Sequence, residues 1–481
     1  MKISFPTLDK VDEAVGEMLE RAVRSHHRRR LTKLGFPGVL NPQSADLWVP
    51  GERPPRAGNA VEVLVDGDDA LAALADALAQ ARSHAHIAGW HLTPNFRLTR
   101  DLGAPTLVEL LNGLGERVGV RVILWAGPPM PAFQPTRGAM KKVQSELTQL
   151  GRVQCVLDAR ERTLHCHHEK IVVIDDEVAF VGGIDLSDLS GDRWDRRTHP
   201  PRGAIGWHDA ATRLRGPIVA DVAEHFRQRW NEVAHQHVPP PVIQPPAGAV
   251  TLQLVRTVPE RTYDFAPRGE FSIAEAYVRA LRSAERLIYL ENQFLWSTEI
   301  AQVLMDKLRN PPHPDFRMVL VLPARPSSGA DTTRGQLGCL VDADDGAGHL
   351  LAATLVTDGP YAPYVHAKVG VIDDRWLTIG SANLNEHSLF NDTEVNIVTQ
   401  DADLARQTRL ALWSEHLDRP EADLAGDPTT VIDTIWKVQA DQPDSSSAQP
   451  AAARAKITRL PAVSRRAERL IGPVRGLLVD G

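Results

Sequence analysis

The stretches HHEKIVVIDD (residues 167–176) and VHAKVGVIDD (residues 365–374) share the pattern His-x-Lys, four residues, then Asp. Each continues for six residues to a glycine-led turn, Gly182-Gly183 in the first copy and Gly380-Ser381 in the second. A single octet could arise by chance, but a matched pair with matched sequels indicates an internal duplication. The duplication predicts one site that uses both copies, because one imidazole can attack phosphorus while a second protonates the leaving group.

Each copy predicts a short buried strand that presents a histidine and a lysine together. Val and Ile dominate the segments KIVVID (170–175) and KVGVID (368–373), which is typical of buried strands. Side chains two residues apart share a strand face, so each histidine should project beside the lysine of its motif. The pairs are His168 with Lys170 and His366 with Lys368.

The aspartate that ends each motif has a different expected role. Asp175 and Asp373 lie at odd offsets from the histidine, so their side chains should face the other way, near the strand end. We expect both aspartates to be scaffolds that tie down the turn that follows. The residues expected to build the next, glycine-led turns are Gly182, Gly183, Asp185, Gly380 and Ser381.

The motifs and their surroundings resemble the phospholipase D superfamily, whose HxKx4Dx6G signature occurs twice here. The likeness covers about residues 58–420 and extends to four blocks that are similar to those of the true phospholipase D enzymes. They are HCHHEKIVVIDDEVAFVGGIDL (165–186) followed by Arg193-Trp194-Asp195, WHDAATRLRGPIVADVAEHFRQRWN (207–231), IYLENQFL (288–295), and YVHAKVGVIDDRWLTIGSANLNEHSL (364–389) followed by Asp392-Thr393-Glu394. The resemblance implies an α/β fold of two similar halves, packed face to face with pseudo-two-fold symmetry around one cleft.

The hydrophobic pattern along the chain agrees with that division. Strands and helices alternate in the same order in two regions, which predicts a mixed β-sheet flanked by helices in each half. The proline-rich stretch HVPPPVIQPPAGA (237–249) is expected to be a stiff connector. The expected segments are an N-terminal extension (1–57), the first half (58–237), the linker (238–250), the second half (251–420) and a C-terminal extension (421–481), disordered around 441–453.

The resemblance implies roles for individual residues. The catalytic motif residues would be His168, Lys170, Asp175, His366, Lys368 and Asp373, with His168 as the nucleophile and His366 as the acid. Each histidine also needs an acceptor on its far nitrogen. Glu394 lies 28 residues after His366 and Asp195 lies 27 residues after His168, so we expect a matched pair of orienting acids.

The glycine-led turns differ between the copies. The second reads Gly380-Ser381-Ala382-Asn383, and the Asn383 amide can donate to a phosphate oxygen, as can Lys170 and Lys368. The first copy carries Asp185 at the position of Asn383, where an ionised carboxylate would repel phosphate. We therefore expect Asp185 to be structural or turned towards a head group. This difference matches the true phospholipase D pattern better than that of the symmetric nucleases.

Composition narrows the class of protein. A chain of 481 residues exceeds the usual single-domain size, and its net charge of −7 argues against an overall basic nucleic-acid binder. Its three cysteines form neither a metal pattern nor a disulfide framework. Alternation splits the cluster His165-Cys166-His167-His168 across two strand faces, so no metal and no cofactor are expected. We expect a cytoplasmic monomer, at most peripherally attached to a membrane; the basic run at 26–33 could touch lipid phosphates or be a solvated helix face.

Three function classes follow from these patterns. The leading one is a phospholipase D that acts on a phospholipid at a membrane surface. It would form a phosphohistidine intermediate, from which water releases phosphatidate or an added alcohol accepts the phosphatidyl group. The second is a phosphatidyltransferase of cardiolipin synthase type, whose members usually carry N-terminal membrane spans. The third is a nuclease or tyrosyl-DNA phosphodiesterase, disfavoured because the latter has Asn at the positions of Asp175 and Asp373. No nucleic-acid partner is expected.

Overall fold

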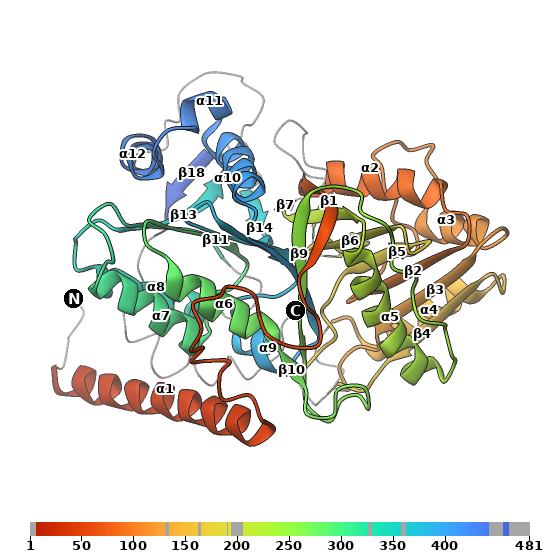
Figure 1. The fold of residues 1–481 in the computed structure, drawn as a ribbon, viewed down its shortest axis with the longest axis horizontal. Coiled ribbons are helices and arrows are strands. Elements are labelled where there is room, and N and C mark those ends of the chain that lie inside the picture. Colours follow the sequence, from red (N-terminus) through yellow and green to blue (C-terminus); the bar gives the residue numbers. More distant parts are fainter. Residues whose placement is uncertain are drawn as a thin grey trace.

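The computed structural model describes residues 6–129, 134–161, 165–189, 191–193, 205–325, 330–356, 362–441 and 456–460. Its elements form two halves that lie next to each other, each a sheet with helices against it (Figure 1). The first half contains β1 (Arg56–Val65), α2 (Asp66–Ala79), β2 (His84–Gly89), α3 (Leu107–Leu114), β3 (Gly119–Trp125), α4 (Arg137–Thr148), β4 (Val153–Asp158), β5 (Ile171–Ile174), β6 (Val178–Gly182), β7 (Ile205–His208), β8 (Ala210–Arg215) and α5 (Ile218–Ala234).

The second half repeats this plan. It contains β9 (Val250–Val258), β10 (Glu270–Phe271), α6 (Ser272–Ser283), β11 (Leu287–Asn292), α7 (Thr298–Arg309), β12 (Arg317–Val321), α8 (Ala330–Asp344), β13 (Leu350–Val356), β14 (Ala362–Val365), β15 (Lys368–Ile372), β16 (Trp376–Gly380), α9 (Glu386–Phe390), β17 (Glu394–Thr399) and α10 (Ala402–Leu417). Strand order runs β1-β8-β6-β5-β2-β3-β4 in the first half and β9-β17-β16-β15-β11-β12-β13 in the second. The order is therefore the same in both halves, and the predicted α/β fold of two similar halves is confirmed.

The halves join edge to edge, so the expected face-to-face packing is wrong. β1 pairs antiparallel with β9, with Arg56 opposite Leu252 and Asn59 opposite Val250, so one hydrogen-bonded sheet runs through both halves. A second link is the parallel pair β7–β14, which forms a separate two-stranded sheet. Buried apolar side chains from both halves also share one core cluster, in which Val173 and Val181 lie with Val395 and Ile397. The two halves therefore form a single body.

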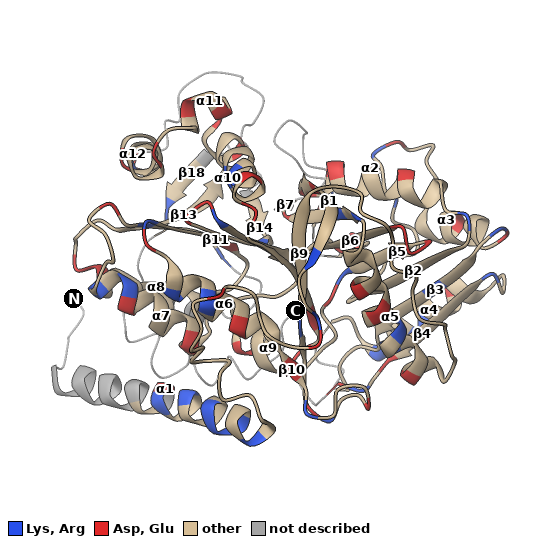
Figure 2. Ribbon diagram, in the orientation of Figure 1, with Lys and Arg blue, Asp and Glu red and all other residues tan. Residues whose placement is uncertain are grey.

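Both chain ends of the described region pack onto the second half. Helix α1 (Pro6–Leu34) carries the basic run in its last turns (Figure 2). Arg30 donates to Glu260 and Asn391, and the His27 ring stacks on Phe390 with centroids 4.3 Å apart. Much of the basic run is therefore occupied by contacts within the chain.

Residues after 420 complete the second half rather than lying outside it. The elements are α11 (Glu421–Leu424), α12 (Pro428–Val431), the π-helical turn η1 (Ile432–Trp436), α13 (Lys437–Ala440) and β18 (Lys456–Arg459). β18 adds to the sheet antiparallel to β13, and Trp436 is fully buried in the core beside Tyr289. All but the first residue of the segment expected to be disordered, residues 441–453, lie outside the described residues. None of the described helices has the length and hydropathy needed to cross a bilayer.

Candidate active site

Both motifs lie on central strands of their sheets, as predicted. His168 and Lys170 directly precede β5, and Lys368 is the first residue of β15. β5 is hydrogen-bonded between β2 and β6, and β15 between β11 and β16. The side chains of His168, Lys170, His366 and Lys368 are all buried. A ladder on each side therefore fixes the strands β5 and β15 that follow the two motif histidines.

Each motif histidine is also held by the backbone of the opposite half. The His168 amide donates to the carbonyl of Thr393 at 3.0 Å, and the His366 amide donates to the carbonyl of His208 at 2.8 Å. The β7–β14 ladder runs up to the pair Val365 and His208, and His167 forms a parallel bridge to Thr393. The two histidine segments are thereby held against each other where the halves meet.

Each motif histidine also forms a side-chain hydrogen bond with an acid from the other half. Glu394 accepts a hydrogen bond from His168 Nδ1 at 2.9 Å, and Asp209 accepts one from His366 Nδ1 at 2.6 Å. A carboxylate can only accept, so each contact places the proton on Nδ1 and leaves Nε2 as the reactive nitrogen. The sequence predicts that Glu394 orients His366, the histidine of its own copy. In the structure Glu394 contacts His168, the histidine of the other copy.

Asp209 was not selected from the sequence, and Asp195 lies outside the described residues. Asp209 and Glu394 occupy equivalent positions in the two copies. Each lies two residues before a residue, in β8 or β17, that pairs with the first glycine of the glycine-led turn. Those pairs are Ala211 with Gly182 and Asn396 with Gly380. Asp209 lies 41 residues after His168, whereas Glu394 lies only 28 residues after His366. Because the spacing differs between the copies, the equivalence of the two acids could not be recognised from equal spacing.

The motif lysines contact the main chain of their own histidines and one polar side chain each. Lys170 Nζ donates to the His168 carbonyl at 2.7 Å and lies 3.3 Å from Asp185. Lys368 Nζ donates to the His366 carbonyl and, at 3.2 Å, to Gln293 Oε1. The Gln293 oxygen also accepts from the Asn383 amide at 3.5 Å, so the residues expected to bind phosphate in the second copy are gathered together. Gln293 lies in the 288–295 block but was not singled out from the sequence.

Comparisons with known proteins agree with this geometry. Residues 277–414 match a protein family described as "Cardiolipin synthase, PLD-like domain". The chain is 26% identical to Phospholipase D A of Dictyostelium discoideum over 76% of the chain and 36% of that protein, and 25% identical to Phospholipase D alpha 4 of Arabidopsis thaliana over 71% and 62%. It also resembles the crystal structure of a phosphatidylserine synthase from Haemophilus influenzae, with a TM-score of 0.53 and 11% identity over 81% of this chain and 96% of that one. Together the family match and the relatives support assignment of the chain to the phospholipase D superfamily.

The matched region spans less than two thirds of the length of these two phospholipase D relatives. Within the superfamily fold, the glycine-led turns have a specific steric purpose here. A Cβ at Gly183 would overlap the Asp209 carboxylate, and one at Gly380 would overlap the side chain of Asn396. At the position of Gly183 the second copy carries Ser381, whose hydroxyl donates to Glu394. The turns therefore support the orienting acids as well as reversing the chain.

The superfamily site of this chain contains a buried arginine that the sequence analysis did not assign. The Arg193 guanidinium lies over the Trp207 ring, 3.0 Å from its centroid, and donates through Nη2 to the Leu189 carbonyl at 2.7 Å. Burial lowers the Arg193 pKa to about 10, although Asp185 and Asp209 oppose the shift. No described residue accepts a hydrogen bond from its Nε or Nη1. These donors are available to an anion in the cleft.

The surrounding charges distinguish His366. Burial and the positive charges of Lys368, Arg193 and Lys170 lower the pKa of His366 well below its usual value, and His168 adds to the shift. His366 is therefore neutral in the cleft without substrate. Because the charges of Lys170 and His168 affect the pKa of His366, the first motif lies close to the second.

The motif aspartates hold the backbone, but not at the turn that was expected. Asp175 accepts from the amides of residues 82–84 at 2.7–2.9 Å, and Asp373 accepts from the amides of residues 285–287 at 2.7–2.8 Å. These segments lead into β2 and β11, the strands next to the motif strands. Both aspartates have positive φ, 55° and 53°, so each caps its strand in a left-handed conformation. The aspartates thus tie each motif strand to its neighbour.

Proposed function

We propose that this chain is a phospholipase D that hydrolyses the distal phosphodiester of a glycerophospholipid, such as phosphatidylcholine, to phosphatidate and a free alcohol. The observation that supports it best is the crossed pair of contacts, His168 with Glu394 and His366 with Asp209, in one cleft. Two imidazoles with fixed tautomers and free Nε2 atoms are the groups that a double displacement at phosphorus needs.

In the proposed reaction, the cleft first binds the phosphate anion. Lys170, Lys368, Asn383 and Arg193 carry N–H donors, and cationic donors in a buried site stabilise both the bound anion and the more crowded transition state. The anion offsets the positive charges that lower the His366 pKa, so binding favours protonation of His366. Substrate binding thereby converts His366 from a neutral imidazole to an acid.

His168 then attacks. Its Nε2 forms a bond to phosphorus while the bond from phosphorus to the head-group oxygen breaks, and His366 gives its Nε2 proton to the departing alkoxide. Neutral His366 next takes a proton from water, the oxygen attacks phosphorus, and the phosphorus–nitrogen bond breaks to release phosphatidate and restore His168. An added alcohol in place of water would give a transphosphatidylation product. No step in this sequence uses a metal or cofactor.

The lipid part of the proposal rests on the similarity to the named phospholipase D relatives, which covers 71–76% of this chain. The net charge of −7 makes a polyanionic nucleic acid an unsuitable substrate. In this proposal the chain acts as a monomer in the cytoplasm, on phospholipid at a membrane surface.

A phosphatidyltransferase of cardiolipin synthase type is the second candidate. The family description matched by residues 277–414 favours it, and the same histidines would serve both reactions. The difference lies in the acceptor, which would be a lipid alcohol instead of water.

Product analysis tests both candidates. The full chain is incubated with vesicles of mixed phospholipids, with phosphatidylglycerol and glycerol as acceptors, and with plasmid DNA. Phosphatidate with free head group supports phospholipase D, whereas cardiolipin as the main product supports the transferase. Cleavage of the DNA with intact lipid would refute both. Trapping the labelled intermediate by alkaline denaturation and mapping the phosphate to His366 in place of His168 would reverse their assigned roles.

A further inference from the structure

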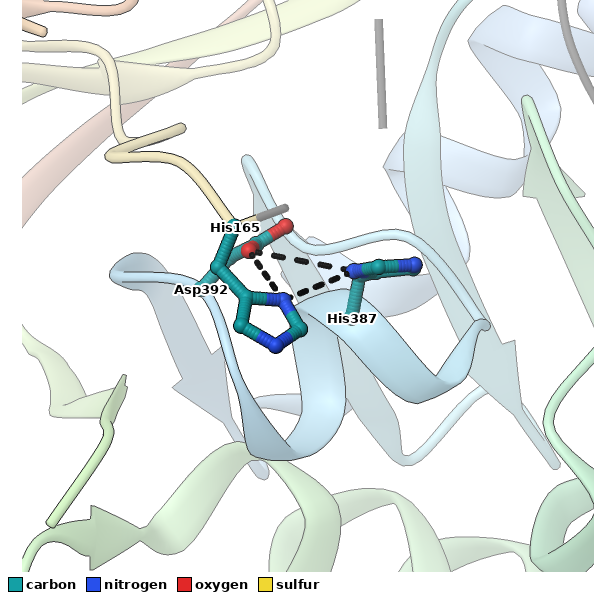
Figure 3. A group of neighbouring side chains, drawn as sticks. All are labelled: His165, His387 and Asp392. Atoms are coloured by element: carbon teal, nitrogen blue, oxygen red, sulfur yellow. Dashed lines mark hydrogen bonds and ion pairs between the residues drawn. The ribbon is translucent and has the colours of Figure 1, made fainter. Parts of the chain in front are cut away.

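A second cluster of histidine and carboxylate groups lies behind the catalytic pair. It consists of His165 from the first half and His387 and Asp392 from the second, whose side chains point towards one another (Figure 3). His165 Nδ1 lies 3.0 Å from His387 Nδ1 and 3.5 Å from Asp392 Oδ1, and His387 Nδ1 lies 4.0 Å from the same oxygen. Three atoms that can bind a metal therefore converge from two separate parts of the chain.

The spacing fits a tetrahedral transition-metal ion. Zinc bonds of 2.0–2.1 Å to nitrogen and oxygen place neighbouring ligand atoms about 3.3 Å apart in a tetrahedron. The three separations, 3.0, 3.5 and 4.0 Å, lie on both sides of that value. The ligand types, two imidazoles and one carboxylate, are also those that zinc accepts. Alternation along one strand excluded a site built from residues 165–168 alone, but it could not exclude ligands contributed by the other half.

The surroundings of the cluster hold its carboxylate in place. The Cys166 amide donates to Asp392 at 2.9 Å. His387 and Asp392 are buried, while the His165 side chain is 17% exposed.

Two other groups of histidines and acids are less suited to a metal. Both include His208, whose Nδ1 and Nε2 are already bonded to Asp66 at 2.8 Å and Glu291 at 2.7 Å. Although burial opposes it, the negative charges of Asp66 and Glu291 raise the His208 pKa well above its usual value. A protonated imidazole has no lone pair for a metal.

We propose that His165, His387 and Asp392 form a binding site for a zinc-like transition-metal ion that fastens the two halves together beside the active site. His165 lies three residues before His168, and Asp392 lies two residues before Glu394. The ion would therefore clamp the two segments whose contact orients His168. It takes no part in bond making at phosphorus, and the proposal does not depend on which phosphodiester the chain cleaves.

Metal titration of the full chain tests this site. Chain stripped with chelator is titrated with Zn²⁺ against a chromogenic zinc indicator, and we expect one site per chain. His387→Gln and His165→Gln should each weaken binding at least about tenfold, as loss of a ligand costs at least as much as loss of an outer-shell partner. His237→Gln, an exposed histidine of the linker, is the matched control and should bind as the wild type does.

Two further readouts keep the test decisive. Zn²⁺ should raise the melting temperature of the wild type but not that of His387→Gln, and Co²⁺ should give a tetrahedral visible spectrum that the same substitution abolishes. His165→Gln is the safer variant if His387→Gln fails to fold, since His165 is partly exposed. Equal binding by the wild type and His165→Gln would overturn the proposal. So would loss of binding only in His416→Gln, because His416 belongs with His208 and Glu291 to one of the two other groups. Phospholipid cleavage measured in parallel reports on the proposed function separately.

Discussion

Asp209 and His366 belong to different halves of the duplication, and the Asp209 carboxylate accepts a hydrogen bond from His366 Nδ1 at 2.6 Å. The reciprocal contact joins Glu394 to His168 at 2.9 Å. Each half thus supplies one histidine and the acid that orients the histidine of the other. Neither half contains a motif histidine together with the carboxylate that orients it, so the site exists only in the assembled body.

Asp209→Asn should lower kcat by about 10²–10⁴-fold, the range that a positioned acid or base contributes. The amide can donate to Nδ1, which would favour the wrong tautomer of His366 and remove its stabilising charge. Glu394→Gln should cause a comparable loss through His168. Steady-state phosphodiester cleavage measures both, with the exposed Asp403→Asn as the control. Full activity in Asp209→Asn would show that the crossed contact is only structural.

Arg193→Gln should lower kcat/KM by about 10²–10³-fold, since it removes cationic donors that face the transferred phosphate. Arg193→Lys keeps the charge and should recover part of the loss, which a purely structural role would not predict. The comparison requires equal melting temperatures, and Arg213→Gln, whose ion pair with Glu62 lies away from the cleft, serves as the control. An unchanged kcat/KM in a folded Arg193→Gln protein would remove this residue from the site.

The sequence predicted the parts of the site that depend on local pattern. Duplicated motifs placed His168, Lys170, His366 and Lys368, because strand periodicity fixes which side chains share a face. Asp209 was not predicted because it contacts the histidine of the other half. Its spacing from the histidine of its own copy also differs from the equivalent spacing of Glu394. A usable signal existed: in both copies an acid stands at the start of a buried strand, Asp209 directly before β8 and Glu394 as the first residue of β17.

The missed features of the fold have the same origin. Periodicity says which face of a strand is buried but not which edge it pairs with, so the β1–β9 join could not be predicted. Residues after 420 appeared to form an extension because β18 is separated from its partner β13 by about a hundred residues of sequence. The basic run of α1 likewise gave no indication that Arg30 bonds Glu260.

Asp373→Asn should lower the free energy of unfolding by about 0.5–1.5 kcal/mol, because an amide leaves one or more of the backbone donors that the carboxylate binds without a protein acceptor. The carboxylate accepts from the amides of residues 285–287, outside the reacting groups. Turnover per folded molecule should therefore change little at temperatures below the transition. Chemical denaturation measures the effect against Asp306→Asn, a surface position on α7. A large loss of turnover with unchanged stability would make the aspartate a catalytic group.

Removal of metal should leave the chemical step intact. All proposed bond changes are assigned to His168, His366 and water, while the proposed ion only fastens the halves. Treatment with chelator should lower the melting temperature but not the rate of phosphodiester cleavage well below it. Complete inactivation that added Zn²⁺ reverses at that temperature would contradict the proposed mechanism.

His86 should make stability depend on acid. Burial, together with the charges of His84 and Arg227, lowers the His86 pKa from 6.5 to about 2. Below pH 6.5 the unfolded chain therefore binds a proton that the folded chain does not, and the free energy of unfolding falls as pH decreases. One such group contributes a slope of up to about 1.4 kcal/mol per pH unit.

His86→Phe should remove that contribution while keeping the ring stacked on Phe226, whose centroid is 4.6 Å away. The measurement is the free energy of unfolding by denaturant at several pH values between about 4 and 7. The variant should show a shallower slope than the wild type, whereas His237→Phe in the exposed linker should not. Other groups also titrate in this range, so only the difference between the two slopes is assigned to His86. Parallel slopes would mean that His86 is protonated in the folded protein despite its burial.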